Sequence, residues 1–430
     1  MTYTRETRRG FLKTLAAGVA APSLLASAER LDRALALASI HGARGGSAPA
    51  PWAGLRDQYM LQDGLTYLNH ASIGTVPRAV HQAHVAYLET CETHPHVYVW
   101  EAVWRDVTEE TRSAAARLLR CDAEDVSITH NTTEGFNVLA HGLELGPGDT
   151  VLYSSLNHSG ASGSWEGLAG RRGFTVKRFD FPVERGADLT ADEVVALYAA
   201  QVTDGTRVLV FPHVDNMIGL RHPMEALAAM ARTRGVDWVF VDGAQTAGMI
   251  PLELAASGVD AYAMSPHKWL QSPKGLGLLW TTLRLREAVP RMWMKGSQPA
   301  AGGRAYEDYS TRAWPAVVAL GDALAFQAAL GEGPKEEGYR RLRARIQERV
   351  EAEPGLSWHS PHAWGDGSML VAVGVKGRRA PEIGPLLLEK HGIGVRAFGG
   401  TLNTLRVSPN LAVSDEELDR ALDALVSLAE

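Results

Sequence analysis

A lysine, a carboxylate and several hydrogen-bonding side chains follow short apolar runs in the middle of this sequence. Each group begins where an apolar run ends, and the groups are residues 131–135, 157–158, 213–216, 242–245 and 265–268. In an open parallel sheet, ligands bind beyond the carboxyl ends of the strands. The sequence therefore predicts that a phosphate site, a carboxylate and a lysine converge on one edge of a sheet.

The lysine and the carboxylate are the two groups that an aldehyde cofactor with a pyridine ring requires. Lys268 could form a Schiff base with the aldehyde, and Asp242 could keep the ring nitrogen protonated so that the ring acts as an electron sink. Hydroxyls and backbone N–H groups at the expected helix start near residue 131 would suit a phosphate. This inventory fits pyridoxal phosphate, although composition and periodicity alone leave several α/β chemistries open.

Other common chemistries lack their motifs. The sequence contains no G-x-G-x-x-G, Walker A, H-E-x-x-H or G-x-S-x-G pattern. Two cysteines, Cys91 and Cys121, cannot form a disulfide framework or a four-cysteine zinc site. His94 and His96 lack a carboxylate partner, so we predict no metal site.

Short apolar runs alternate with helical patterns between residues 126 and 280. The expected strands are residues 126–129, 150–153, 174–179, 207–211, 238–242, 261–264 and 277–280, and expected helices include 134–143, 191–201 and 224–234. Such a pattern indicates a mostly parallel sheet covered on both faces. The last run follows its predecessor so closely that we expect one antiparallel strand there.

A second pattern begins beyond residue 320. A long helix is followed by a strand at 369–375, a helix near 381–391, strands near 394–398 and 404–407, and a final helix from Ser414. Asp415 and Glu416 in its first turn suit the helix dipole. We predict an α/β fold with a large domain, residues 56–310, and a smaller α+β domain, residues 311–430. The N-terminal segment of the large domain could pack on the small domain.

Composition excludes several classes of protein. Of the 430 residues, 45% are hydrophobic and 21% are charged, which is typical of a globular protein. The 43 Lys and Arg residues against 49 Asp and Glu residues give a net charge of −6. This balance argues against a protein that binds nucleic acid by neutralising phosphates.

The first 28 residues resemble a twin-arginine signal peptide. Arg8 and Arg9 precede Phe-Leu-Lys, an apolar stretch at 14–25 and a small-residue cleavage site at 26–28. The apolar stretch is shorter than the roughly 20 residues that span a bilayer, so we expect no stable membrane span. We expect residues 29–55 to form a linker. The resemblance implies export of the folded protein by the twin-arginine machinery to a periplasmic or other extracytoplasmic location.

The blocks that carry the candidate residues resemble a known family. Residues 239–245 read Val-Phe-Val-Asp-Gly-Ala-Gln, and residues 265–268 read Ser-Pro-His-Lys. Further blocks in matching order are residues 67–71, 132–135, 146–149, 213–216 and 405–409. From about Tyr67 to Leu425 the chain is similar to the class V aminotransferases, pyridoxal-phosphate-dependent enzymes of fold type I. The resemblance implies a seven-stranded, mostly parallel mixed sheet in the large domain.

This resemblance assigns roles around the cofactor ring. Lys268 would form the Schiff base and move the Cα proton of an amino-acid substrate, while Asp242 would pair with the ring nitrogen. Gln245 and Asn216 would hydrogen-bond the phenolic oxygen, and His158 would stack on the ring.

It also assigns residues around the phosphate and the substrate. The implied phosphate ligands are Thr132, Thr133, Ser265 and His267. Arg406 would clamp the substrate α-carboxylate in a bidentate fork, which a lysine could not reproduce, and Arg396 would line the same pocket. Thr311 matches a position from which a neighbouring subunit touches the phosphate, so we expect a homodimer with shared sites.

The reaction is less constrained than the cofactor. Cysteine desulfurases carry a nucleophilic cysteine shortly before the carboxylate-binding arginine, whereas residues 396–403 contain none. This departure predicts that the protein is not a cysteine desulfurase. Residues 69–71 and 310–315 are more similar to the isopenicillin N epimerase-like branch. An aminotransferase or amino-acid epimerase is therefore the first hypothesis, a C–S or other lyase the second, and a non-catalytic binding protein of the same fold the third.

Overall fold

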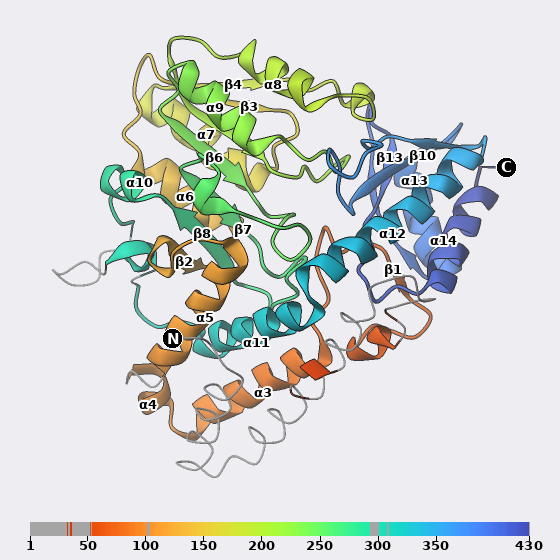
Figure 1. Ribbon diagram of the computed structural model, residues 1–430, viewed down its shortest axis with the longest axis horizontal. Coiled ribbons are helices and arrows are strands. Elements are labelled where there is room, and N and C mark those ends of the chain that lie inside the picture. The colour runs from red at the N-terminus through yellow and green to blue at the C-terminus, as the bar shows by residue number, and fades with distance from the viewer. Residues whose placement is uncertain are drawn as a thin grey trace.

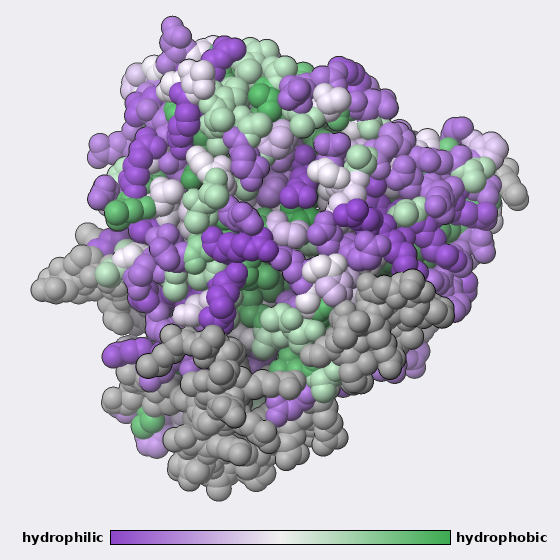
Figure 2. Space-filling model, viewed as in Figure 1, coloured by the Kyte–Doolittle hydropathy of each residue, from purple (hydrophilic) through white to green (hydrophobic). Residues whose placement is uncertain are grey.

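The structure is a computed structural model that describes residues 32, 35–36, 52, 54–100, 104–292, 301–307 and 309–429. The predicted signal peptide lies outside these residues, as does most of the predicted linker. Polar residues cover much of the molecular face drawn in Figure 2. Within the described part of the chain, no individual helix has the length and apolar composition of a membrane span. Only the bent pair of α11 (Trp314–Leu330) and α12 (Glu332–Ala352) passes that test.

The large sheet has seven strands in the order β2-β8-β7-β6-β5-β3-β4 (Figure 1). They are β2 (Val126–Thr129), β3 (Thr150–Ser154), β4 (Thr175–Phe179), β5 (Thr206–Pro212), β6 (Trp238–Asp242), β7 (Ala261–Met264) and β8 (Gly277–Thr281). Strands β3 to β7 are parallel, whereas β8 is antiparallel to β7 and β2. The predicted seven-stranded, mostly parallel sheet with an antiparallel last strand is confirmed.

Apolar side chains cover both faces of this sheet because successive strand residues point to opposite sides. In β6, Val239 and Val241 belong to one core cluster, while Phe240 stacks on Trp165 in another, with ring centroids 6.0 Å apart. Helices α6 (Thr132–Gly142), α7 (Ser159–Arg172) and α10 (Leu283–Ala288) supply the second cluster. Helices α5 (Arg105–Leu119), α8 (Ala191–Ala199), α9 (Met224–Thr233) and α11 supply the first.

The C-terminal part forms a separate antiparallel sheet, which Figure 1 shows in blue beside the large sheet. Its order is β12-β13-β10-β9, with β9 (Leu356–Trp358), β10 (Val371–Val375), β12 (Arg396–Phe398) and β13 (Thr404–Val407). Helices α12, α13 (Ala380–His391) and α14 (Asp415–Ser427) accompany it. Ser414 and Glu417 form a capping box at the start of α14, where Asp415 and Glu416 occupy the first turn as predicted.

The N-terminal segment joins this C-terminal part before it reaches the large sheet. Strand β1 (Thr66–Tyr67) pairs in parallel with β11 (Ile393–Gly394). Helices α3 (Arg78–Thr93) and α4 (Pro95–Trp100) follow, and α11 packs against α3 and α5. Short 3-10 turns lie at Leu55–Gln58, Ala123–Asp125, Val183–Arg185, Leu254–Ala256 and Gly302–Tyr306.

Candidate active site

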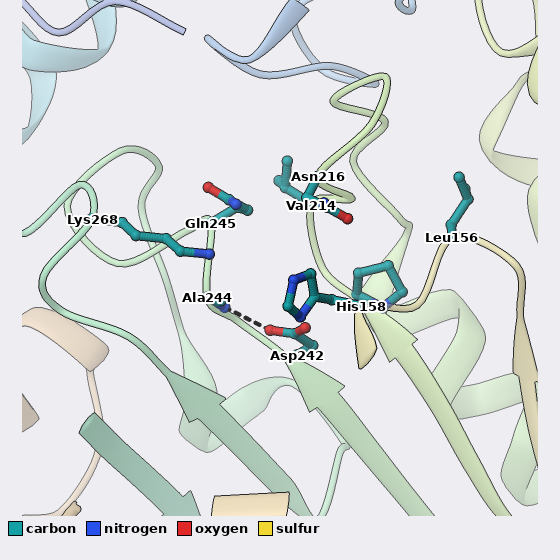
Figure 3. A pocket seen from close by; sticks show the side chains of 9 residues that line it. Leu156, His158, Val214, Asn216, Asp242, Ala244, Gln245 and Lys268 are labelled. Atoms are coloured by element: carbon teal, nitrogen blue, oxygen red, sulfur yellow. Dashed lines mark hydrogen bonds between the residues drawn. The ribbon is translucent and has the colours of Figure 1, made fainter. Parts of the chain in front are cut away.

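A pocket lies at the carboxyl ends of β3, β5 and β6, beside the loop after β7 (Figure 3). It opens to solvent and has a volume of about 240 Å³ with that open part included, and its lining residues are Leu156, His158, Pro212, Val214, Asn216, Asp242, Ala244, Gln245 and Lys268. Five of these are residues that the sequence singled out. The fold therefore brings His158, Asn216, Asp242, Gln245 and Lys268 together.

Asp242 and Lys268 are an acid and an amine in one buried space. Asp242 ends β6, is 5% exposed, and accepts a hydrogen bond from the backbone N–H of Ala244 at 2.9 Å. Burial raises the pKa of Asp242, and the nearby charge of Lys268 partly offsets that effect. Burial lowers the pKa of Lys268 to about 8, although the Asp242 carboxylate opposes the shift. The amine can therefore lose its proton near neutral pH.

His158 stands where β3 leads into α7, and Figure 3 shows its ring beside Asp242. It is the N-cap of α7, and its Nδ1 accepts a hydrogen bond from the N–H of Gly160 at 3.0 Å. This contact places the proton of the neutral ring on Nε2. Burial lowers the pKa of His158, opposed by the Asp242 carboxylate. The ring forms part of the pocket wall, and it is uncharged at any pH above the usual pKa of histidine.

Hydrogen bonds fix Gln245 and the segment after Lys268. The Gln245 amide donates to the carbonyl of Ala71 at 2.8 Å and accepts from the indole Nε1 of Trp269 at 2.9 Å. Gln271 has a positive φ of 60°, and its Oε1 accepts from the hydroxyl of Tyr59 at 2.8 Å. The backbone on both sides of the pocket is therefore held by the N-terminal segment.

At Gly74 the N-terminal segment passes close to the backbone of the lysine. Its N–H donates to the carbonyl of His267 at 3.0 Å, and a Cβ atom at position 74 would lie 1.9 Å from the carbonyl oxygen of Lys268. Only glycine fits between these two loops. Sequence reasoning missed Gly74, although its position just after the block at residues 67–71 was a usable signal.

Two predicted phosphate ligands meet at the start of α6. The N–H and the hydroxyl of Thr132 both contact the hydroxyl of Ser265, at 3.2 and 2.8 Å. Asn131 caps the helix by accepting from the N–H of Glu134 at 2.9 Å. Thr133 is exposed in the first turn, and a Cβ at Gly160 would lie 2.8 Å from its hydroxyl. The N-terminal ends of α6 and α7 therefore converge beside the pocket.

The remaining predicted phosphate ligands differ in position. His267 is partly buried next to Lys268, and its Nδ1 is buried without a hydrogen-bond partner among the described residues. Burial and the charges of Lys268 and Lys274 lower the pKa of His267 to about 4. Thr311 is exposed in a bend before α11 and does not line the pocket.

Arg406 lies on β13 and borders the pocket through Asn216. Its guanidinium donates to the carbonyl of Asn216 at 2.9 Å, to Oδ1 of Asn69 at 3.0 Å, and to the hydroxyl of Ser72. It is 2% exposed, and its Nε has no partner within the described part of the chain. Burial and the neighbouring Arg396 lower its pKa to about 10. Sequence reasoning did not select Asn69 or Ser72 as site residues.

A buried carboxylate shapes the loop that carries Asn216. Asp215 is fully buried and accepts three backbone hydrogen bonds, from Met217 at 2.7 Å, Ile218 at 2.9 Å and Leu220 at 2.6 Å. Burial raises the pKa of Asp215 to about 6 against the effect of these bonds. The loop therefore turns tightly enough to present Asn216 to both the pocket and Arg406.

Comparison with known proteins decides the family. Residues 66–420 match the family described as aminotransferase class-V. The chain belongs to this family. Isopenicillin N epimerases from Streptomyces clavuligerus and Amycolatopsis lactamdurans are 29% and 30% identical to it over 89% and 88% of its length, and both are covered over 99% of their own. A probable cysteine desulfurase from Pseudomonas aeruginosa is 30% identical over 82% of this chain and 88% of its own.

Solved structures confirm the fold of this class-V protein. A mutant of C-DES with glycine covalently linked to the pyridoxal phosphate cofactor has a TM-score of 0.78, with 22% identity over 86% of this chain and 98% of that one. The cysteine desulfurase CsdA from Escherichia coli has a TM-score of 0.71, with 25% identity over 88% of this chain and 98% of that one. The predicted fold type I is therefore confirmed.

These comparisons correct one prediction. The exclusion of cysteine desulfurases was wrong, because proteins of that name match most of this class-V chain in sequence and in structure. The exclusion depended on a cysteine missing from one short loop, residues 396–403. The similarity extends over most of the chain, and a single side chain absent from that loop does not outweigh it.

Pyridoxal phosphate is the cofactor of this class-V enzyme, as predicted, and the pocket fits it. A buried carboxylate and an amine of lowered pKa share the space that the ring requires. Among the described residues the Nδ1 of His267 has no hydrogen-bond partner. His267 follows Ser265 by two residues, and Ser265 contacts Thr132 at the N-terminal end of α6, where an anion is favoured. Within the described ranges no group of three His, Cys, Asp or Glu side chains could hold a metal ion.

The pKa of Lys268 predicts how the apoenzyme takes up its cofactor. We expect the rate of incorporation to rise with pH to a midpoint of about 8, because burial lowers the pKa from 10.5 and only the neutral amine is a nucleophile. In Asp242→Asn the midpoint should fall below that of the wild type, because Asp242 raises this pKa. Stopped-flow absorbance across pH measures both values. A wild-type midpoint near 10, or an upward shift in the variant, would contradict the burial argument.

Proposed function

We propose that this protein is an aminotransferase or an epimerase that acts at the Cα of an amino acid, with Lys268 as the proton-moving base. The observation that carries the proposal is that one pocket holds Lys268 and Asp242 and is bordered by Arg406. When bound, the cofactor supplies an electron sink for the charge left on Cα. Lys268 supplies the base, Asp242 supplies the carboxylate that pairs with the ring nitrogen, and Arg406 supplies the guanidinium that binds the substrate carboxylate.

Each of these side chains has a specific task in the proposal. The neutral amine of Lys268 removes the Cα proton and can return it, which requires a pKa near the working pH. The carboxylate of Asp242 holds a proton on the ring nitrogen, and His158 covers one ring face. Gln245 and Asn216 contact the phenolic oxygen. We assign the phosphate to Thr132, Thr133, Ser265 and His267.

The substrate α-carboxylate binds Arg406 in this scheme. The guanidinium now donates to three uncharged oxygens, those of Asn216, Asn69 and Ser72. Bonds to an ionised carboxylate are roughly twice as strong as bonds to neutral acceptors. A carboxylate can therefore compete for these donors, while Asn69 and Ser72 hold the guanidinium in place.

Arg406→Lys tests the clamp. Lysine keeps the charge but loses the planar fork, so we expect KM for the substrate to rise by about 10- to 100-fold, equivalent to about 1.4–2.8 kcal/mol. The visible absorption of the bound cofactor should not change. Steady-state kinetics and absorbance on one preparation measure both. An unaltered KM would remove Arg406 from substrate binding.

The reaction itself is tested by an amino-acid panel in heavy water. A keto acid identifies transamination, a deuterated enantiomer identifies epimerisation, and sulfide, persulfide or free thiol identifies C–S bond cleavage. Cleavage of a C–S bond is the second candidate, because relatives and structural neighbours are named cysteine desulfurases and C-DES is described as a cystine C–S lyase. No product from any amino acid would overturn the enzymatic proposal in favour of a binding protein.

We also propose where the protein works and in what form. Residues 7–28 support export by the twin-arginine route to an extracytoplasmic location. The exposed position of Thr311, near the start of α11, supports a homodimer in which it reaches the other subunit's cofactor site.

A further inference from the structure

Two arginines face each other at the edge of the small sheet. Arg396 on β12 is paired in register with Arg406 on β13. Residues directly opposite in an antiparallel pair have Cβ atoms about 4.5–5.5 Å apart, and like charges in such positions are destabilising. A like-charged pair at this site needs either a compensating acid or an anion from elsewhere.

No salt bridge within the described chain compensates this pair, although the charge of the buried Asp215 carboxylate acts on Arg406 from the loop beside it. Neither Arg396 nor Arg406 forms a salt bridge with any described carboxylate, and the acceptors of Arg406 are all uncharged. Both guanidiniums instead lie over the ring of Phe398, with their Cζ atoms 6.0 and 5.7 Å from its centroid. Burial and the charge of Arg396 lower the pKa of Arg406, and the Asp215 carboxylate only partly opposes that shift.

All three side chains lie on the same face of the sheet. Arg396 and Phe398 are two residues apart on one strand, and Arg406 is the cross-strand partner of Arg396. Arg406 also contacts the backbone of Asn216, which lines the pocket. Arg406 is 2% exposed with an unpaired Nε, whereas Arg396 is exposed. The pair therefore has one buried guanidinium that contacts a pocket-lining residue and one that is open to solvent.

We propose that the substrate is a dicarboxylic amino acid, with its α-carboxylate on Arg406 and its second carboxylate on Arg396. This proposal rests on the proposed function, in which Arg406 takes the α-carboxylate. The second carboxylate supplies the ion-pair partner that Arg396 lacks among the described residues, and the guanidinium fork of Arg396 suits its planar shape. Both guanidiniums lie over the ring of Phe398, and this shared position sets the distance between the two carboxylates that they bind.

Glutarate and pentanoate test this proposal in the holoenzyme. Both have five carbons and no amino group, so neither can react, and only glutarate carries a second carboxylate. We expect wild-type protein to bind glutarate at least about 10-fold more tightly by calorimetry, since charged hydrogen bonds are the strong ones. Arg396→Gln should abolish this preference and leave pentanoate binding within about twofold. Arg396→Lys should restore part of it.

Arg379→Gln is the matched control, because Arg379 is an exposed arginine of the same domain that pairs with Glu382 at 3.2 Å. It removes the same charge and should leave the preference for glutarate intact. Equal binding of the two acids by wild-type protein, or equal weakening of both by Arg396→Gln, would overturn the proposal. Because neither acid reacts, this result is independent of whether Cα chemistry occurs. A failed amino-acid panel with a retained glutarate preference would count against the proposed reaction alone.

Discussion

Lys268→Ala is expected to lose the cofactor's visible absorption band and to reduce activity at least about 10³-fold. In our proposal the variant removes both the amine that links to the cofactor and the base that moves the Cα proton, and a general base alone contributes roughly 10²–10⁴-fold. Pyridoxal phosphate should still bind weakly through the phosphate site at α6. Absorbance after gel filtration and turnover of the substrate found in the panel measure the two losses.

Lys335→Met is the control for this variant. Lys335 is a buried lysine whose pKa burial lowers to about 8, as for Lys268, but its amine contacts Gln327 at 3.0 Å and does not line the pocket. Its replacement should preserve the band, whatever its effect on thermal stability. A Lys268→Ala protein with an undiminished band would show that another amine holds the cofactor.

Asp242→Asn is expected to reduce kcat by roughly 10²–10³-fold while the cofactor stays covalently bound. Asparagine has nearly the same shape, but without the negative charge the ring nitrogen loses its proton, and the loss of one preorganised electrostatic contact at a reacting centre is of this size. The band should persist because Lys268 is intact. Single-turnover kinetics separates this chemical effect from substrate binding.

Asp260→Asn is the matched control, because it changes a second buried aspartate of the same sheet. Asp260 lies before β7, at the opposite end of the strands from the pocket, and pairs with Arg232 and Arg284. Its replacement should lower the melting temperature and leave kcat unchanged. Equal kcat losses in the two variants would indicate that Asp242 acts through stability of the sheet.

The central strands were predictable because they are buried on both faces. β2, β6 and β7 have the bounds expected from their apolar runs, β3, β4 and β8 differ by one residue at one end, and β5 is longer by one residue at each end. Helix α7 was not predicted, because its glycines remove the apolar stripe that marks a helix. One of them, Gly160, has a reason in the fold, where a side chain would meet Thr133.

Helix α11 begins at Trp314, before the predicted start beyond residue 320. Pro315 occupies its first turn, a position where proline costs no hydrogen bond. The predicted domain boundary at residue 310 remains a prediction. Helix α11 lies after that boundary in the sequence and packs against α3 and α5, which lie before it.

The site was predictable where its residues follow strands. Asp242 and Lys268 stand at or just beyond the ends of β6 and β7, where local sequence and the rule for parallel sheets suffice. Asn69, Ser72 and Gly74 could not be placed this way. They contact Arg406 or the loop of Lys268, beside the strand β1 that pairs with β11, and such a long-range contact between two-residue strands has no local signal.

The most direct test of the account is reduction of the holoenzyme with borohydride, followed by digestion and mass spectrometry of the lysine peptides. Reduction makes the link between cofactor and amine permanent, so the labelled residue identifies the attachment site. We predict a single cofactor label, on Lys268, with Lys335 and Lys274 unlabelled. A label on either of those two residues, or a protein that binds the cofactor without any label, would contradict the central claim.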